Sequence, residues 1–268
     1  MAADEGSFVE SFRVFLELSD KRRIGADKSS LSVLGVGSGG GELDIQMLSL
    51  LQSTLPAVPI TADIMEGSSK LTDNFKVIAV QCTFDWHTLN SEDYAKQVIA
   101  KGDVKKFDFI FRYEKGLFAV LKVLYYVDDL ERTIKFYHSL LKPNGRLICS
   151  CKKGGWDTLW KAYEKELHDG PVTHFYSSAE VVACLKNLGL KYEQHTFFPS
   201  CDITECFNPS SGTGKQLLYF MTSQEDFYQS FTPEIRAGML DLLRNKCSTE
   251  KDGRVFFNDG FSCILVDP

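Results

Sequence analysis

A run of glycines directly after a buried strand is the feature that most constrains this chain. Residues 30–36 are mostly apolar and predict a buried strand, which runs into Gly37-Ser38-Gly39-Gly40-Gly41. Gly35, Gly37 and Gly40 form a G-x-G-x-x-G pattern, and residues 42–55 follow with helical periodicity. Such a turn lets the backbone approach a ligand closely and offers it unpaired N–H groups. The pattern therefore predicts a nucleotide-type ligand site, and the alternative is a bare glycine-rich turn.

Strand and helix patterns alternate along most of the chain. This alternation predicts an α/β protein with a doubly wound, mostly parallel seven-stranded sheet of the Rossmann-like kind, covered by helices on both faces. The chain closes with two more predicted strands, separated by the turn Asn258-Asp259-Gly260. The predicted strands are 30–36, 58–65, 76–82, 107–111, 146–151, 191–198, 254–257 and 261–266, and the predicted helices are 8–18, 42–55, 91–101, 128–141, 177–188 and 232–244.

The length of 268 residues fits one large domain, so we expect a single domain over residues 1–268. Residues 202–247 interrupt the strand–helix alternation before the last strands. We interpret this stretch as a helical insertion within the domain, because no linker-like composition separates it from the rest.

Charge and composition restrict the partners. The net charge is −6 and the pI is near 5.5, whereas a protein that binds phosphate backbones is usually basic, so no nucleic-acid partner is expected. No apolar run reaches the ~20 residues of a membrane span, and the first residues lack the apolar core of a signal peptide. The eight cysteines show no Cys-x-x-Cys or zinc spacing. We therefore expect free thiols, no metal site and a cytoplasmic location.

An acidic residue follows the second predicted strand. Glu66 lies directly after residues 58–65. In a doubly wound sheet, an acid at this place accepts hydrogen bonds from the ribose hydroxyls of a nucleotide. That role suits the adenosine of either NAD or S-adenosylmethionine, and the alternative is a solvated loop carboxylate.

Longer motifs favour S-adenosylmethionine. Two stretches are similar to class I S-adenosylmethionine methyltransferases. One is the helix 128–141 with the turn Lys142-Pro143-Asn144-Gly145 and the strand after it, and the other is Gly41-Glu42-Leu43-Asp44. The chain from Phe8 to Asp267 resembles the histamine N-methyltransferase family. The stretches that carry this resemblance are Val9-Glu10-Ser11-Phe12-Arg13, Gly41-Glu42-Leu43-Asp44-Ile45-Gln46, Leu124-Tyr125-Tyr126-Val127, Gly155-Trp156-Asp157-Thr158-Leu159-Trp160-Lys161, Asn187-Leu188-Gly189-Leu190-Lys191-Tyr192-Glu193 and Asp202-Ile203-Thr204-Glu205-Cys206-Phe207.

The resemblance implies a class I methyltransferase fold with a substrate-binding insertion, S-adenosyl-L-methionine as cofactor and a monomer. The implied reaction is methyl transfer to the imidazole ring nitrogen of histamine. No catalytic side chain is implied, because the sulfonium methyl group is already activated and the protein has to supply proximity and orientation. The implied cofactor-binding residues are Gly37, Glu66, Ser91 and Leu121, and the implied substrate-binding residues are Asp259, Phe8, Phe12, Tyr125, Tyr126, Trp156 and Trp160. For the aromatic residues the alternative is simple core packing.

The chain departs from the family at three substrate positions. The family's Glu after the first helix has no equivalent, and Asp20 is the acid nearest to that place. Lys122 stands where the family has Gln, and Asp259 where it has Asn. Three functions remain open: a small-amine N-methyltransferase acting on histamine, a cofactor- or amine-binding protein with altered or lost catalysis, and a nicotinamide-dependent oxidoreductase.

Overall fold

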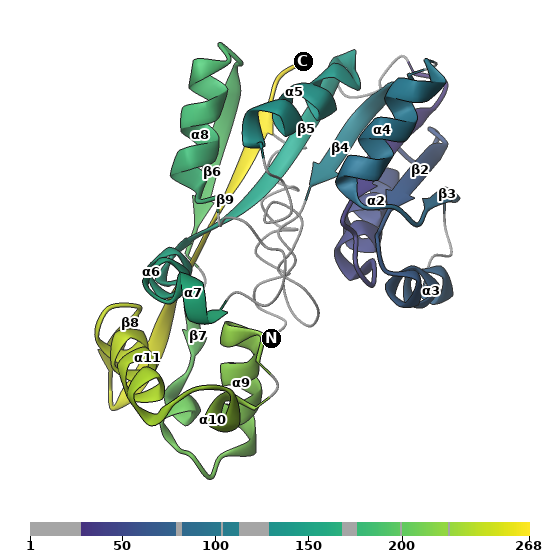
Figure 1. Cartoon of the computed structure of the whole chain (residues 1–268). Helices are drawn as coiled ribbons and strands as arrows, with labels where there is room; N and C mark the ends of the chain where they lie inside the picture. Colours follow the sequence, from purple (N-terminus) through teal and green to yellow (C-terminus); the bar gives the residue numbers. More distant parts are fainter. Residues whose placement is uncertain are drawn as a thin grey trace.

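The computed structural model describes residues 28–78, 82–102, 104–112, 129–167, 176–198, 200–224 and 226–268. A central sheet with the strand order β3-β2-β1-β4-β5-β9-β6 organises these residues (Figure 1). The strands β1, β2, β3, β4 and β5 run parallel, and β9 is antiparallel to both β5 and β6. The bounds are β1 (Leu31–Val36), β2 (Ile60–Met65), β3 (Thr83–His87), β4 (Phe107–Arg112), β5 (Leu141–Gly154), β6 (Tyr192–Phe197) and β9 (Arg254–Val266). The predicted seven-stranded, mostly parallel sheet is confirmed.

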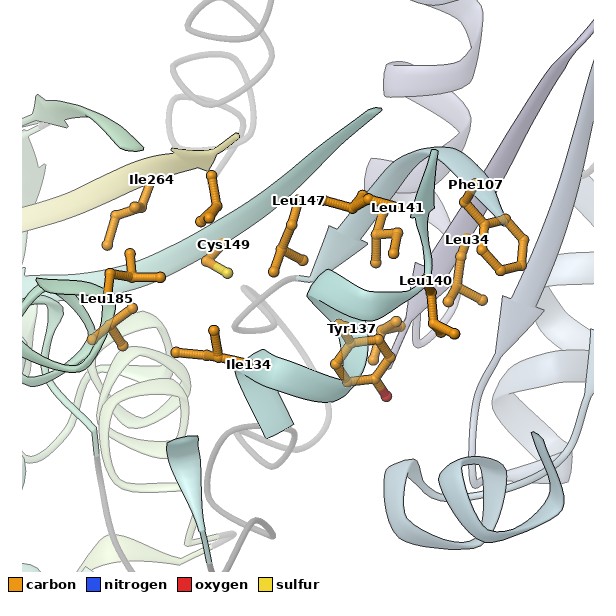
Figure 2. Close-up of a cluster of buried hydrophobic side chains, with 14 of the residues drawn as sticks. Leu34, Phe107, Ile134, Tyr137, Leu140, Leu141, Leu147, Cys149, Leu185 and Ile264 are labelled. Carbon is orange, nitrogen blue, oxygen red and sulfur yellow. The ribbon is translucent and has the colours of Figure 1, made fainter. Parts of the chain in front are cut away.

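Helices cover both faces of this sheet. The helices beside it are α2 (Glu42–Thr54), α3 (Ser69–Ile78), α4 (Ser91–Lys101), α5 (Leu130–Ser139) and α8 (Ser178–Asn187). Because both faces are covered, all six residues of β1 are buried. One apolar cluster joins α2 and α3 to the sheet and includes the fully buried Met47, Leu51 and Phe75. The other cluster packs α4, α5 and α8 on the opposite face and includes Ile134, Tyr137 and Leu185 (Figure 2).

A third apolar cluster lies beyond the carboxyl end of β5. Trp156 of α6 and Phe257 of β9 form part of it, together with the helices that Figure 1 shows gathered around the first half of β9. The segment 202–247, predicted to be an insertion, supplies most of these helices. The elements here are α6 (Gly155–Ala162), α7 (Glu164–Leu167), β7 (Ser200–Asp202), η1 (Thr204–Phe207), α9 (Gly212–Thr222), α10 (Phe227–Ser230), α11 (Pro233–Asn245) and β8 (Ser248–Lys251).

Two predictions about local structure are wrong. The strand predicted at 76–82 begins inside a helix, because the chain from Ser69 to Ile78 is α3, and the third strand begins at Thr83. The predicted turn Asn258-Asp259-Gly260 is also absent, since β9 continues without a break from Arg254 to Val266. The strand continues because residues around 259 pair with β5, where Asp259 lies opposite Gly154.

The turn lies instead between β8 and β9. Lys251 pairs with Arg254, so Asp252 and Gly253 form a two-residue connection. Their φ angles of 53° and 71° are the left-handed values that a type I′ hairpin requires. The predicted helix 8–18 lies outside the described residues. Within the described part of the chain, no helix is both long and apolar enough to cross a bilayer.

The junction between β5 and α6 gives the first prediction. A Cβ on Gly155 would lie 2.7 Å from a ring carbon of Phe257 and 2.8 Å from the carbonyl oxygen of Cys247. We therefore expect Gly155→Ala to lower the free energy of unfolding by about 1–3 kcal/mol through overpacking, measured by urea denaturation. Gly212 is the matched control, since it also begins a helix and a Cβ there meets nothing within 4 Å. Equal stability of the two variants would contradict the close packing of this junction.

Candidate functional site

The glycine loop joins β1 to α2 at the carboxyl edge of the parallel strands. Gly37, Gly39 and Gly41 have φ angles of 68°, 63° and 85°. These left-handed values favour glycine, because a side chain would clash with the backbone there. The Gly37 amide donates a hydrogen bond to the Met65 carbonyl over 2.8 Å, which ties the loop to the end of β2. A Cβ on Gly41 would lie 2.1 Å from the Phe75 ring, so α3 packs directly against the loop.

Glu66 connects the end of β2 to this loop. Its carboxylate is buried and accepts hydrogen bonds from the Gly39 amide over 2.7 Å and from the Ser68 amide over 3.0 Å. The Glu66 amide donates to the His87 carbonyl at the end of β3 over 3.0 Å. A carboxylate has about four acceptor positions, and its oxygens are of the kind that accept hydrogen bonds from ribose hydroxyls. The structure thus places Glu66 against the glycine loop rather than in a solvated surface loop.

Ser91 begins α4, just beyond the carboxyl end of β3. Asn90 caps the helix, since its side chain accepts a hydrogen bond from the Asp93 amide over 2.9 Å. The N-cap of α4 is therefore Asn90, and Ser91 is the first helical residue. The Ser91 hydroxyl lies 2.7 Å from the hydroxyl of Tyr137 on α5. Gly37, Glu66 and Ser91 follow the ends of three adjacent parallel strands, which is where ligands bind in open α/β sheets.

Trp156 and Asp259 meet at the carboxyl end of β5. Asp259 is buried in β9 opposite Gly154, and its carboxylate accepts a hydrogen bond from the indole N–H of Trp156. The Trp156 ring is itself buried and packs edge-on against Phe220 and Phe257. Asp259 is therefore held by sheet pairing and by an indole donor, in place of the turn geometry that the sequence predicted.

Trp160 is buried four residues further along α6. Its indole N–H donates a hydrogen bond to the Met221 carbonyl on α9 over 3.2 Å. Both tryptophans belong to the third apolar cluster, so the described contacts of Trp160 are those of a core residue. The remaining predicted site residues, Phe8, Phe12, Leu121, Tyr125 and Tyr126, lie outside the described residues, as do Asp20 and Lys122.

Two polar residues near the site were not among the residues predicted from the sequence. Asp157, in the first turn of α6, has a buried carboxylate oxygen without a hydrogen-bond partner among the described residues. Burial raises its pKa to about 6, while nearby Lys161 lowers the pKa in part. Tyr137 is fully buried yet carries the hydroxyl that contacts Ser91. No sequence pattern points to either residue, because an acid on a helix usually faces solvent and Tyr137 fits the apolar periodicity of α5.

A surface depression of about 620 Å³ lies away from this edge. It is located where α2 ends and β2 begins, hence at the amino-terminal edge of the parallel strands. The side-chain amide of Gln52 donates to the carbonyls of Leu55 and Val58 over 3.1 and 3.3 Å, so it serves to hold that turn. The lining residues are Ser49, Gln52, Ser53, Pro56, Ala57, Val58 and Pro59.

Comparison with known proteins agrees with the fold. A family model described as a methyltransferase domain matches residues 10–195. Histamine N-methyltransferase A of Xenopus laevis is 34% identical to this chain, and the alignment covers 100% of this chain and 97% of that protein. Carnosine N-methyltransferase 2 of Gallus gallus is 33% identical, over 97% of this chain and 86% of that protein.

Solved structures show the same fold at much lower identity. The YcgJ protein of Bacillus subtilis has a TM-score of 0.57 and 12% identity, with coverage of 99% of this chain and 98% of that chain. The mycolic acid cyclopropane synthase CmaA1, solved with SAH and CTAB, has a TM-score of 0.52 and 9% identity, over 92% of this chain and 81% of that chain. The chain is a class I methyltransferase by fold. It belongs to the methyltransferase family that includes the histamine N-methyltransferases, which removes the nicotinamide-dependent oxidoreductase from consideration.

The raised pKa of Asp157 gives the second prediction. Its ordinary value is 3.8 and the folded value is about 6, so the folded state binds more protons than the unfolded state between those pH values. Asp157 therefore reduces stability as pH rises from about 4 to 6, by about 1–2 kcal/mol, because solvent screens part of the effect at this half-buried carboxylate. We expect Asp157→Asn to raise the free energy of unfolding at pH 7 and to leave it unchanged near pH 4, measured by urea denaturation.

Glu234, in the first turn of α11, supplies a control of opposite sign. Hydrogen bonds from its own backbone amide and from Thr232 lower the pKa of its carboxyl group. The ionised form of Glu234 therefore adds stability above the ordinary pKa, and this contribution is lost as pH falls. We expect Glu234→Gln to lower stability at pH 7. If Asp157→Asn also lowers stability at pH 7, the carboxylate of Asp157 has a stabilising partner and the burial argument fails.

Proposed function

We propose that this protein transfers the methyl group of S-adenosyl-L-methionine to an imidazole ring nitrogen of a small amine, with histamine as the first substrate. The observation that carries the proposal is the full-length similarity to histamine N-methyltransferases, together with a fitting cofactor edge. The similarity to a carnosine N-methyltransferase makes carnosine a second candidate, because both molecules carry an imidazole ring. We further propose that the protein acts as a cytoplasmic monomer.

The described residues fit the cofactor. Gly37 gives the backbone its left-handed turn beside the end of β2, where a ligand can approach the N–H groups closely. Glu66 presents a buried carboxylate for ribose hydroxyls, and Ser91 a partly buried hydroxyl for the base. We assign Leu121 to the same group on the family resemblance. When bound, S-adenosylmethionine supplies a methyl group that is already activated, because a sulfonium carries it.

The amine is held at the other end of the same edge. We assign its ammonium group to Asp259, whose carboxylate the indole N–H of Trp156 orients. An ammonium–carboxylate contact in a buried place is charge-assisted and therefore strong. We assign the ring of the substrate to the aromatic residues that the family resemblance implies, namely Phe8, Phe12, Tyr125, Tyr126, Trp156 and Trp160.

The reaction then depends on how the ring nitrogen and the methyl carbon are aligned, more than on acid–base side chains. The lone pair of a neutral ring nitrogen forms the new N–C bond as the C–S bond breaks, with its electron pair left on sulfur. Imidazole titrates near pH 6.5, so at neutral pH much of the ring is in the reactive neutral form. The proton on the other ring nitrogen leaves to solvent afterwards. The protein has to hold the two reacting atoms at about 3–3.5 Å and in line.

A methyl-transfer assay tests the proposal. Purified protein is incubated with methyl-deuterated S-adenosylmethionine and either histamine, carnosine or tyramine, an amine without an imidazole ring. Mass spectrometry should find labelled N-methylhistamine and no labelled tyramine. Transfer to carnosine alone would change the substrate assignment. Cofactor binding without transfer to either imidazole would instead favour the alternative, a relative with altered or lost catalysis.

The glycine loop gives the third prediction. We expect Gly37→Ala to weaken S-adenosylmethionine binding at least tenfold, about 1.4 kcal/mol, measured by isothermal titration calorimetry, because a Cβ intrudes where the ligand approaches. Gly102 is a matched control, since its φ of 69° nearly equals the 68° of Gly37 and a Cβ there meets nothing within 4 Å. Gly102→Ala should carry the same backbone strain and keep the dissociation constant within about twofold. Equal affinities of the two variants would remove the loop from the site.

Asp259 gives the fourth prediction. Asp259→Asn keeps an oxygen for the indole N–H of Trp156 and removes the charge, so the fold should be retained. We expect the Michaelis constant for histamine to rise about tenfold, roughly 1.4 kcal/mol, with the S-adenosylmethionine affinity unchanged. Asn258→Ala is the control, because Asn258 is exposed on the neighbouring position of β9 and accepts from Thr249. Unaltered histamine kinetics in Asp259→Asn would make Asp259 a structural partner of Trp156 only.

A further inference from the structure

Tyr137 is a polar residue in an apolar layer. It is fully buried on α5, in the cluster formed with Leu34, Leu140 and other side chains. Figure 2 shows its ring among the apolar side chains of this cluster, with the hydroxyl oxygen pointing away from the labelled side chains. A buried hydroxyl lowers stability unless it is hydrogen-bonded, so the partners of this group explain its place in the layer.

The described partners of the Tyr137 hydroxyl belong to the cofactor edge. The Ser91 hydroxyl lies 2.7 Å away, and the sulfur of Met65 lies 4.0 Å away. Met65 is the last residue of β2 and directly precedes Glu66. Tyr137 therefore connects the end of β2 to the start of α4, which are the two segments that carry the proposed ribose acid and the proposed base-contacting serine.

The chemistry of the three groups sets the direction of these hydrogen bonds. A thioether sulfur only accepts, and it accepts weakly, whereas a serine hydroxyl accepts well. The phenol is also the more acidic of the two hydroxyls, so it is the better donor. The favoured arrangement has Tyr137 donating to Ser91. The proton of Ser91 is then available to a ligand, because Ser91 is only partly buried.

We propose that Tyr137 is a positioning residue for the cofactor, which makes the Ser91 hydroxyl a hydrogen-bond donor toward an acceptor nitrogen of the adenine ring. This inference rests on the proposed function, because it needs a cofactor with an adenine base at Ser91. Tyr137 itself does not touch the cofactor. Without its hydroxyl, Ser91 can rotate and use its proton within the protein, so the base loses part of an oriented contact.

A double-mutant cycle on binding tests the inference. Isothermal titration calorimetry with S-adenosylhomocysteine, which does not react, gives dissociation constants for the wild type, Tyr137→Phe, Ser91→Ala and the double variant. We expect Tyr137→Phe to weaken binding about three- to tenfold, Ser91→Ala about tenfold, and the double variant no more than Ser91→Ala. The Michaelis constant for S-adenosylmethionine should rise in Tyr137→Phe while kcat stays within about twofold.

A second buried tyrosine provides the control. Tyr94 lies in the same layer on α4 and packs against the His87 ring, so Tyr94→Phe removes a comparable hydroxyl. That variant should bind S-adenosylhomocysteine as the wild type does. Additive losses from Tyr137 and Ser91, or an unchanged affinity in Tyr137→Phe, would overturn the inference while the proposed function stands. If the wild type itself does not bind S-adenosylhomocysteine, both the proposed function and this inference are wrong.

Discussion

The structure depends on β9, a strand that is hydrogen-bonded along both of its edges. Its second half, from Asp259 to Val266, pairs with β5, and residues 261–266 also pair with β6. Its first half pairs with β7 and β8. The strand therefore joins the main sheet to the helices beyond the carboxyl end of β5. Asp259 lies where the pairing changes from one half to the other, and this register directs its carboxylate to Trp156.

The cofactor edge is held by a second set of backbone contacts. The amides of Gly37 and Glu66 donate to the carbonyls that end β2 and β3, and the Glu66 carboxylate accepts from Gly39. These bonds fix the ends of three parallel strands relative to one another before any ligand binds. A preorganised edge of this kind loses little conformational entropy when a cofactor is bound. It is also the part of the site that depends least on which amine is methylated.

The sequence predicted the regular elements well where patterns were long and local. The strand 31–36 and the helix 91–101 lie within one residue of their predicted bounds. The predicted strand 76–82 failed because a short apolar run, Val77-Ile78-Ala79-Val80, does not distinguish a helix from a strand by periodicity. Its first part belongs to the helix α3, whose Phe75 packs against the glycine loop.

Two Asp-Gly pairs show why the end of the chain could not be predicted from local signals. Asp252-Gly253 forms the hairpin turn, whereas Asp259-Gly260 continues a strand. Both pairs carry the same turn preference, and only pairing with the distant β5 distinguishes them. Likewise, the contact of Tyr137 with Ser91 joins residues 46 positions apart, which periodicity cannot show. The glycine loop and Glu66 were predictable because strand ends of parallel sheets place such residues together.

The central claim is that the carboxyl edge of β1, β2 and β3 binds S-adenosylmethionine. A crystal structure of the protein grown with S-adenosylhomocysteine tests it most directly. The account predicts the ribose hydroxyls within hydrogen-bond distance of the Glu66 carboxylate, about 3.2 Å or less, with the glycine loop 37–41 against the nucleoside. A nucleoside bound away from Glu66, or one without contact to the glycine loop, would contradict the account.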